Sequence, residues 1–223
     1  MGVPTPTWPG SSMFQWGRCA AACRGCEPHC ARPWRRPNMD PRADELWLEP
    51  LGAAHAPALA WQYRSPAIAE LTQLPPLRDP AHAADWIRHR LAQPVLVRAL
   101  MAPHVGLVGC VELMLSDQDA FLCLWIGTDW QGRGWGQRLI ALSCELAAAQ
   151  GAVLVLTATL HHNATSRAAF GRCGFSELPG RARPPDQERV FLYRAPTFID
   201  QALAWQRLVD FAARMNTGMD LVS

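Results

Sequence analysis

The chain has 223 residues, of which 49% are hydrophobic, and its 21 lysine-plus-arginine and 19 aspartate-plus-glutamate side chains give a formal net charge of +2. This balance lacks the dense basic face of a nucleic-acid-binding protein, and no run of about 18 apolar residues is present to form a transmembrane helix. The first 40 residues also lack the apolar stretch of a signal peptide. We therefore expect a cytoplasmic globular protein with reduced thiols, and neither nucleic acid nor membrane as a partner.

Residues 1–41 differ in composition from the rest of the chain. They hold seven prolines and four cysteines without helical or strand periodicity, so we predict a disordered leader. The cysteines form the pattern C-x3-C-x2-C-x3-C, whose thiolates suit zinc or an iron–sulfur cluster. Typical zinc modules separate their two ligand pairs by a longer loop, so we predict no metal site. Met39 offers a second start of translation, and both interpretations of the leader stay open.

Globular patterning begins after the leader. Residues 45–51 predict a short strand, and residues 53–71 predict helix broken at Pro66. Residues 79–93 predict a helix with Asp79 as its cap and Pro80 in its first turn. Three β-rich segments, 94–101, 107–115 and 120–127, follow with short turns between them, which is typical of an antiparallel meander.

The second half of the domain alternates helices and strands. A helix begins near Gly134 and ends at Gly151, a buried strand covers 152–160, a short helix covers 163–174, and a last strand covers 189–195. This order predicts an α+β fold with a mostly antiparallel sheet flanked by helices.

Residues 196–223 add a C-terminal amphipathic helix beyond the last strand. A helical stripe supports it, made of Phe198, Ala202, Trp205, Val209, Ala212 and Met215. Three interpretations stay open for this stripe: packing on its own domain, a contact in a homodimer, or a lid over the substrate.

The run DWQGRGWGQRLI, residues 129–140, places glycines just before a helix. The first N–H groups of a helix have no partner within the helix, and the helix dipole adds positive charge there. Glycines allow a ligand to approach without obstruction by Cβ atoms. The run therefore predicts an anion site suited to phosphate or diphosphate, although an ordinary strand-to-helix turn would also explain it.

Two motifs resemble those of a known family. Gln131, Gly134 and Gly136 form Q-x-x-G-x-G, which resembles the acetyl-CoA diphosphate loop of the GNAT superfamily of N-acetyltransferases. The segment NATSRAAFGRCGF, residues 163–175, is similar to the second motif of that superfamily, in the serine form of the RimJ/RimL-like branch. The resemblance implies a GNAT-like fold and divides the chain into a leader (1–41), an N-acetyltransferase domain (42–195) and a C-terminal helix (196–223).

The resemblance also implies a binding site for acetyl-CoA as co-substrate, between two strands that splay apart. Ile126 and Thr128 would offer backbone groups to the pantetheine arm, and the N–H groups of residues 132–137 would hold the diphosphate. The residues implied in that loop are Gln131, Gly132, Arg133, Gly134, Trp135, Gly136 and Gln137. Trp135 would pack under the loop or lie along the cofactor. Asn163, Ser166 and Arg167 would face the pantetheine arm, although Asn163 is equally suited to capping a helix.

For the reaction, we predict Glu112 as the base that deprotonates the amine. The alternative is that Glu112 is an ordinary strand residue whose side chain faces outward. A backbone N–H near Ile126 would polarise the thioester. Many family members have a tyrosine as general acid where this chain has Phe170, and its only tyrosines are Tyr63 and Tyr193.

Two functions from different classes are compatible with this sequence. The first is an acetyl-CoA-dependent N-acetyltransferase acting on a protein N-terminus or a small-molecule amine. Its acceptor pocket would involve the broken helices, including Trp61, Tyr63 and Arg64, together with the hairpins of the meander. The second is a non-catalytic acyl-CoA-binding regulatory module, which the missing tyrosine favours.

Overall fold

A computed structural model describes residues 45–72 and 77–222, so the predicted leader and its cysteines lie outside the described residues. The first half of the fold consists of β1 (Trp47–Pro50), η2 (Ala53–His55), α1 (Ala56–Tyr63), α2 (Pro66–Thr72), α3 (Pro80–Leu91), β2 (Val95–Ala102), β3 (Gly106–Ser116), β4 (Asp119–Ile126) and η3 (Thr128–Trp130). The second half consists of α4 (Trp135–Ala149), β5 (Leu154–Leu160), α5 (Ala164–Arg172), β6 (Ser176–Glu177), β7 (Arg181–Ala182), β8 (Arg189–Arg194), α6 (Gln201–Arg214) and β9 (Leu221–Val222).

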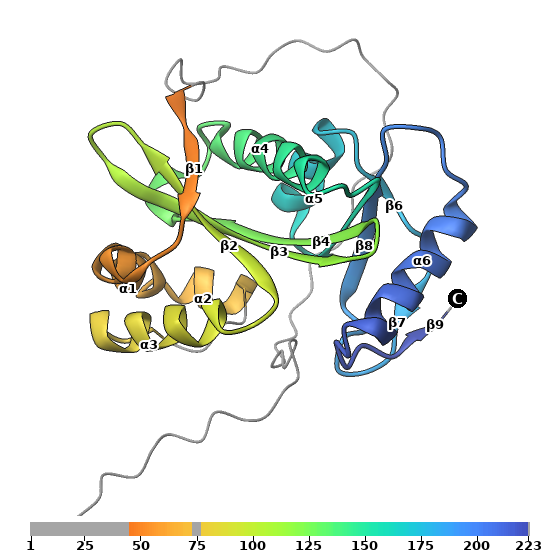
Figure 1. Ribbon diagram of the computed structural model, residues 1–223, viewed down its shortest axis with the longest axis horizontal. Helices are drawn as coiled ribbons and strands as arrows, with labels where there is room; N and C mark the ends of the chain where they lie inside the picture. Colours follow the sequence, from red (N-terminus) through yellow and green to blue (C-terminus); the bar gives the residue numbers. More distant parts are fainter. Residues whose placement is uncertain (1–44, 73–76, 223) are drawn as a thin grey trace, which may run out of the picture.

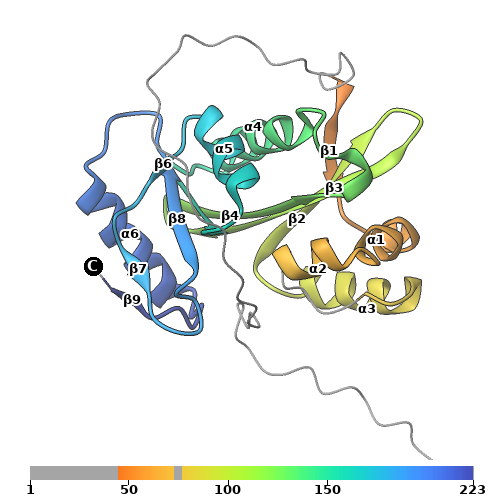
Figure 2. The same ribbon diagram turned by 180° about the vertical axis from the view of Figure 1, so that it is seen from behind.

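The central sheet has the strand order β1-β2-β3-β4-β5-β8-β6. Every neighbouring pair is antiparallel except β4 and β5, which run parallel because α4 crosses over between them. The predicted α+β fold with a mostly antiparallel sheet is therefore confirmed. Figures 1 and 2 show α4 and α5 on one face of this sheet, which we call the back face.

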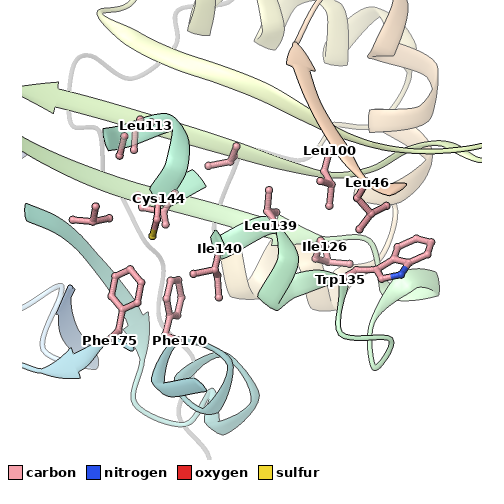
Figure 3. Close-up of a cluster of buried hydrophobic side chains, with 14 of the residues drawn as sticks. Leu46, Leu100, Leu113, Ile126, Trp135, Leu139, Ile140, Cys144, Phe170 and Phe175 are labelled. Carbon is pink, nitrogen blue, oxygen red and sulfur yellow. The ribbon is translucent and has the colours of Figure 1, made fainter. Parts of the chain in front are cut away.

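A large apolar core fills the space between the back face and α4 with α5 (Figure 3). Leu139 and Ile140 of α4 are buried against Phe170 of α5, whose ring meets that of Phe175 edge-on at 5.0 Å. Full burial of one such side chain stabilises the fold by about 1.5–3 kcal/mol. This core fixes the start of α4 relative to the ends of the strands.

The opposite face, the front face, has helices at both ends. Cys110 on β3 and Trp125 on β4 pack under α1, α2 and α3, whereas Met114 and Phe121, farther along the same strands, pack under α6. The middle of the front face lies between these two groups of helices. Two residues of β3 and β4 that project there, Glu112 and Cys123, lie opposite each other and recur in the candidate functional site.

The C-terminal helix packs on its own domain. Its buried residues are Ala204, Trp205, Leu208, Phe211 and Ala212. The predicted stripe was therefore partly wrong: Phe198 precedes the helix and is 97% exposed, and Ala202 is exposed. Asp119, buried at the start of β4, forms ion pairs with Arg207 and Arg214 of α6. Ion pairs as well as apolar packing therefore hold α6 against the sheet.

Candidate functional site

The parallel strands β4 and β5 separate part-way along their length. Their register runs from Asp119 opposite Leu154 to Leu122 opposite Thr157 and ends there. Both strands continue, β4 to Ile126 and β5 to Leu160, without pairing with each other. The sheet therefore contains a split, closed at Leu122 and open at the carboxyl ends of the two strands.

The peptide groups of β4 alternate in direction, as in any strand. The N–H of Gly127 donates to Val108 on β3, so the groups of Gly127 and Trp125 point toward β3. The groups of Leu124 and Ile126 then point the other way, into the split, and Gln131 donates from Nε2 to the Ile126 carbonyl at 3.0 Å. The N–H groups of Leu124 and Ile126 therefore line the split as a strand edge that pairs with no other strand among the described residues.

The N-terminus of α4 lies at the open end of this split. Gly132 and Gly134 have φ angles of +75° and +81°, which favour glycine, and a Cβ on Gly132 would meet no atom within 4 Å. Within the part of the chain that the structure describes, the N–H groups of residues 132–136 have no hydrogen-bond partner. Unpartnered N–H groups at a helix start are a ready site for an anionic group.

Two stacked tryptophans, Trp130 and Trp135, pack beside this loop. Trp135 is 3% exposed and belongs to the core beside Leu46 and Leu100 (Figure 3), and its ring stacks on Trp130 with centroids 5.6 Å apart. Trp135 thus packs under the loop, as the first of the two predicted alternatives had it. Arg133 is exposed, with its guanidinium 5.2 Å from the centre of the Trp130 ring. The same guanidinium lies 5.6 Å from the centre of the Trp135 ring and donates to the Asp129 carbonyl at 3.4 Å, so it lies over the two tryptophans of the loop.

The residues predicted on the other side of the split have structural partners. The Asn163 side chain accepts from the Ser166 N–H at 3.0 Å and caps α5, so its Oδ1 acts as the helix cap. Arg167 donates to Glu177 from Nε at 2.9 Å and to the His161 carbonyl at 3.4 Å. Asn163 keeps its amide Nδ2 without a partner among the described residues, whereas the Arg167 guanidinium is committed to β6 and the end of β5.

A family model described as "Acetyltransferase (GNAT) domain" matches residues 45–176, more than half of the chain. The chain belongs to the GNAT acetyltransferase family. This confirms the predicted family, while the RimJ/RimL-like branch stays a prediction. No curated protein matches the sequence.

Solved structures of GNAT proteins are similar to this chain in fold, at low sequence identity. Spermidine N-acetyltransferase from Vibrio cholerae, in complex with CoA and spermine, is 15% identical over 68% of this chain and 96% of that chain, with a TM-score of 0.59. Microcin C7 self-immunity acetyltransferase, in complex with acetyl-CoA and AMP, is 16% identical over 71% and 98%, with a TM-score of 0.59. Ribosomal-protein-S5-alanine acetyltransferase from Vibrio fischeri is 12% identical over 67% and 92%, with a TM-score of 0.58.

The front face of the GNAT domain carries an ion pair that sequence reasoning missed. Glu112, the predicted base, projects from β3 opposite Cys123, and Arg90 of α3 holds both of its carboxylate oxygens, with Nε donating to Oε1 at 2.9 Å. The two side chains are only 12% and 13% exposed, so Glu112 is not the outward-facing residue of the alternative interpretation. No sequence spacing links Arg90 to Glu112, because the contact joins α3 to β3.

Cys123 lies between this ion pair and a second one across the split. Burial and the charge of Glu112 raise the pKa of the Cys123 thiol to about 12, while Arg189 and Arg90 act in the opposite direction. Arg189 is itself buried and donates to Asp186 at 2.6 Å. A thiol with such a pKa stays protonated near neutral pH and is a poor nucleophile.

The hydroxyl groups of the two tyrosines have partners elsewhere. Tyr63 is 3% exposed, donates to Thr72 at 2.8 Å, and meets the Trp125 ring edge-on. Burial raises its pKa well above the ordinary value, so it is a weak proton donor. The Tyr193 hydroxyl reaches the Ile199 carbonyl at 3.5 Å, and Phe170 is buried in the core. No tyrosine in the described residues therefore replaces the missing general acid.

Of the helical residues predicted at the acceptor pocket, Trp61 and Arg64 are exposed and stack at 3.1 Å, whereas Tyr63 is buried. Gln62 was not predicted. It is 8% exposed, its Nε2 donates to the Leu107 carbonyl on β3, and its Oε1 lies against the Cβ-free side of Gly127. Gln62 therefore ties α1 to the strand end where the loop begins.

No helix in residues 45–72 and 77–222 has the length and apolar character needed to cross a membrane. In these same ranges no three histidine, cysteine or acidic side chains are grouped as metal ligands are. The four-cysteine motif of the leader lies outside the described residues.

Proposed function

We propose that this chain is an N-acetyltransferase that moves the acetyl group of acetyl-CoA onto a primary amine by direct attack on the thioester. One observation carries the proposal: among the described residues, an unpaired β4 edge lines a split that opens at a helix start with unpartnered N–H groups. A ligand with a diphosphate and an extended amide-containing arm fits both features at once. Acetyl-CoA has that shape, and it would enter the split as an added strand.

In this arrangement the diphosphate binds the N–H groups of residues 132–136, with Arg133 adding charge. The pantetheine arm lies along Ile126 and toward Thr128, and the amide of Asn163 donates to it from the facing side. Gln131 holds the Ile126 carbonyl and so shapes the loop. Gln137 lies in the first turn of α4, while Ser166 and Arg167 serve the α5 side chiefly through the cap and the Glu177 pair.

The acyl end then lies deeper in the split, near Leu124. The amine nitrogen bonds to the thioester carbon, the carbon–sulfur bond breaks, and its electron pair leaves on the CoA sulfur. We assign stabilisation of the oxyanion to the Leu124 N–H. Leu124 precedes Ile126, where the donor was predicted, by two residues on β4, and it lies deeper in the split. With phenylalanine at position 170, the thiolate takes its proton from water.

Glu112 remains our candidate base, and the proton passes to it from the ammonium directly or through a water molecule. The Arg90 guanidinium sets the direction of the carboxylate on the front face. The acceptor approaches from that face, between α1–α3 and α6. The acceptor class is a protein N-terminus or a small-molecule amine.

The test is transfer of labelled acetyl groups from acetyl-CoA to a panel of amines, including N-terminal peptides, spermine and amino acids. Labelled acetyl is preferable to a thiol reagent because the chain has 8 cysteines of its own. All 21 of its cationic side chains are arginine, so its N-terminus is the only primary amine able to take label itself. Label on an added amine supports the proposal.

Phe170 favours a second candidate, a non-catalytic acyl-CoA-binding module, because it removes the hydroxyl at the usual acid position. Calorimetry separates the two functions. Tight binding of acetyl-CoA, combined with slow hydrolysis and no labelled amine across the panel, would establish the module and exclude the enzyme.

A further inference from the structure

The closed end of the split has its own hydrogen bond. Thr157 on β5 is 2% exposed, and its hydroxyl donates to the carbonyl of Leu122 on β4 at 2.8 Å. Leu122 and Thr157 are also the last pair in the register of the two strands. A buried side-chain bond therefore joins β4 to β5 at the point where backbone pairing ends.

We propose that Thr157 is a positioning residue that fixes the depth of the split and so the place of the thioester. This inference rests on the proposed function, in which the diphosphate binds at the open end and the acyl group points to the closed end. The Leu122 carbonyl and the Leu124 N–H point to the same side of β4. A shift of the closed end therefore moves the acyl group relative to the Leu124 N–H.

The contact distance explains why the hydroxyl matters. An O–H···O hydrogen bond has an ordinary length of about 2.7–2.8 Å, whereas carbon atoms in contact prefer about 3.5 Å or more. A methyl group in place of the hydroxyl would lie too close to the Leu122 carbonyl and would push the strands apart. Thr157 faces the back core near Val155 and cannot turn to solvent. The steric clash would therefore be relieved by separating β4 from β5 at the closed end of the split.

Thr157→Val tests the proposal, because valine keeps the shape and removes the hydroxyl. Misplacement of reacting groups by about 1 Å lowers rates by about a hundredfold, so we expect kcat to fall at least about tenfold. Affinity for CoA without an acyl group stays unchanged, because the loop is untouched. Thr157→Ser keeps the hydroxyl and restores kcat.

A matched control is Thr217→Val. Thr217 is 1% exposed, its hydroxyl donates to the Ala212 carbonyl at 3.4 Å, and it follows α6, which ends at Arg214. If Thr217→Val lowers kcat as much as Thr157→Val, or if Thr157→Val loses kcat and CoA affinity in parallel, the positioning role is wrong. An unaltered kcat in Thr157→Val overturns it as well.

A binding comparison keeps this inference separate from the proposed function. If the wild-type chain acetylates no amine, the proposed function fails, and calorimetry with acetyl-CoA and CoA then judges Thr157 alone. The positioning role predicts that the two ligands bind the wild type with different affinities and that Thr157→Val erases the difference. Equal affinities in the wild type, or a difference that survives the substitution, overturn it.

Discussion

The open end of the split between β4 and β5 and the front face of the sheet are built from different groups. At the open end, the groups that we propose face the ligand are backbone N–H groups of residues 132–136 and of Leu124 and Ile126, which lie at a helix start and beyond the end of strand pairing. On the front face, they are side chains joined across distant elements, above all Arg90 of α3 with Glu112 of β3. In the proposed site, local backbone geometry therefore builds the cofactor half, and tertiary packing builds the acceptor half.

The largest effect is expected from Gly134→Glu, which attacks the backbone half. Gly134 has a φ of +81°, and a glutamate there adds both strain and a negative charge beside the diphosphate. Like charges brought together cost several kcal/mol, so acetyl-CoA affinity should fall at least about a thousandfold by calorimetry. Gly151→Glu is the matched control, since Gly151 has a φ of +86° at the other end of α4. Equal affinity in a folded Gly134→Glu variant would remove the loop assignment.

The next largest effect is expected from Glu112→Gln, which attacks the side-chain half. We expect kcat to fall by about a hundredfold, as for loss of a general base, with acetyl-CoA affinity kept. The substitution also removes the carboxylate charge that Arg90 contacts, so the free energy of unfolding must be measured beside kcat. The double variant Arg90→Gln with Glu112→Gln removes both charges.

The double variant should recover stability without recovering kcat if Glu112 acts on the amine. Arg88→Gln is the control, because it breaks an exposed ion pair to Asp85 on the same helix. Recovery of kcat in the double variant would mean that the Arg90–Glu112 pair serves packing alone.

The same contrast explains what the sequence could predict. The helix starting at the glycine run, the meander and the short helix after Asn163 all follow from local patterns, and the structure has each of them. The two-residue strands β6, β7 and β9 carry no period that a sequence window detects, and they were missed. The stripe of α6 was misplaced because it began at Phe198, outside the helix that forms.

For the candidate site, the glycine loop at the start of α4 was predictable because its residues are adjacent in sequence. The partners of Glu112 were not predictable in this way. Arg90 lies 22 positions earlier, and only the packing of α3 on the sheet brings it close. The Thr157–Leu122 bond spans 35 positions and depends on the parallel pairing of β4 with β5.

Arg133→Gln tests a side chain of the proposed cofactor loop, and we expect it to lower acetyl-CoA affinity less than Gly134→Glu does. Hydrogen bonds to charged groups contribute about 1.5–3 kcal/mol, and the exposed position of Arg133 places it at the lower end, near a tenfold loss of acetyl-CoA affinity. The loss should shrink as salt rises, because the charge is screened. Arg88→Gln again serves as the control. An affinity that is unchanged at low salt would show that Arg133 only packs on Trp130.

The smallest effect is expected at Asn163, where two substitutions separate its role as the cap of α5 from its proposed contact with the pantetheine arm. Asn163→Asp keeps the oxygen that caps α5 at the Ser166 N–H and removes the amide donor proposed for the pantetheine arm. Asn163→Ala removes both and should lower the free energy of unfolding by about 1 kcal/mol, the usual loss for a helix cap.

If Asn163 contacts the cofactor, both variants weaken acetyl-CoA binding by a few-fold, and only the alanine variant loses stability in thermal unfolding. If Asn163 is a cap and nothing more, the aspartate variant binds acetyl-CoA like the wild type. That result would move the cofactor contacts of the facing side away from α5 and leave the β4 edge to hold the arm.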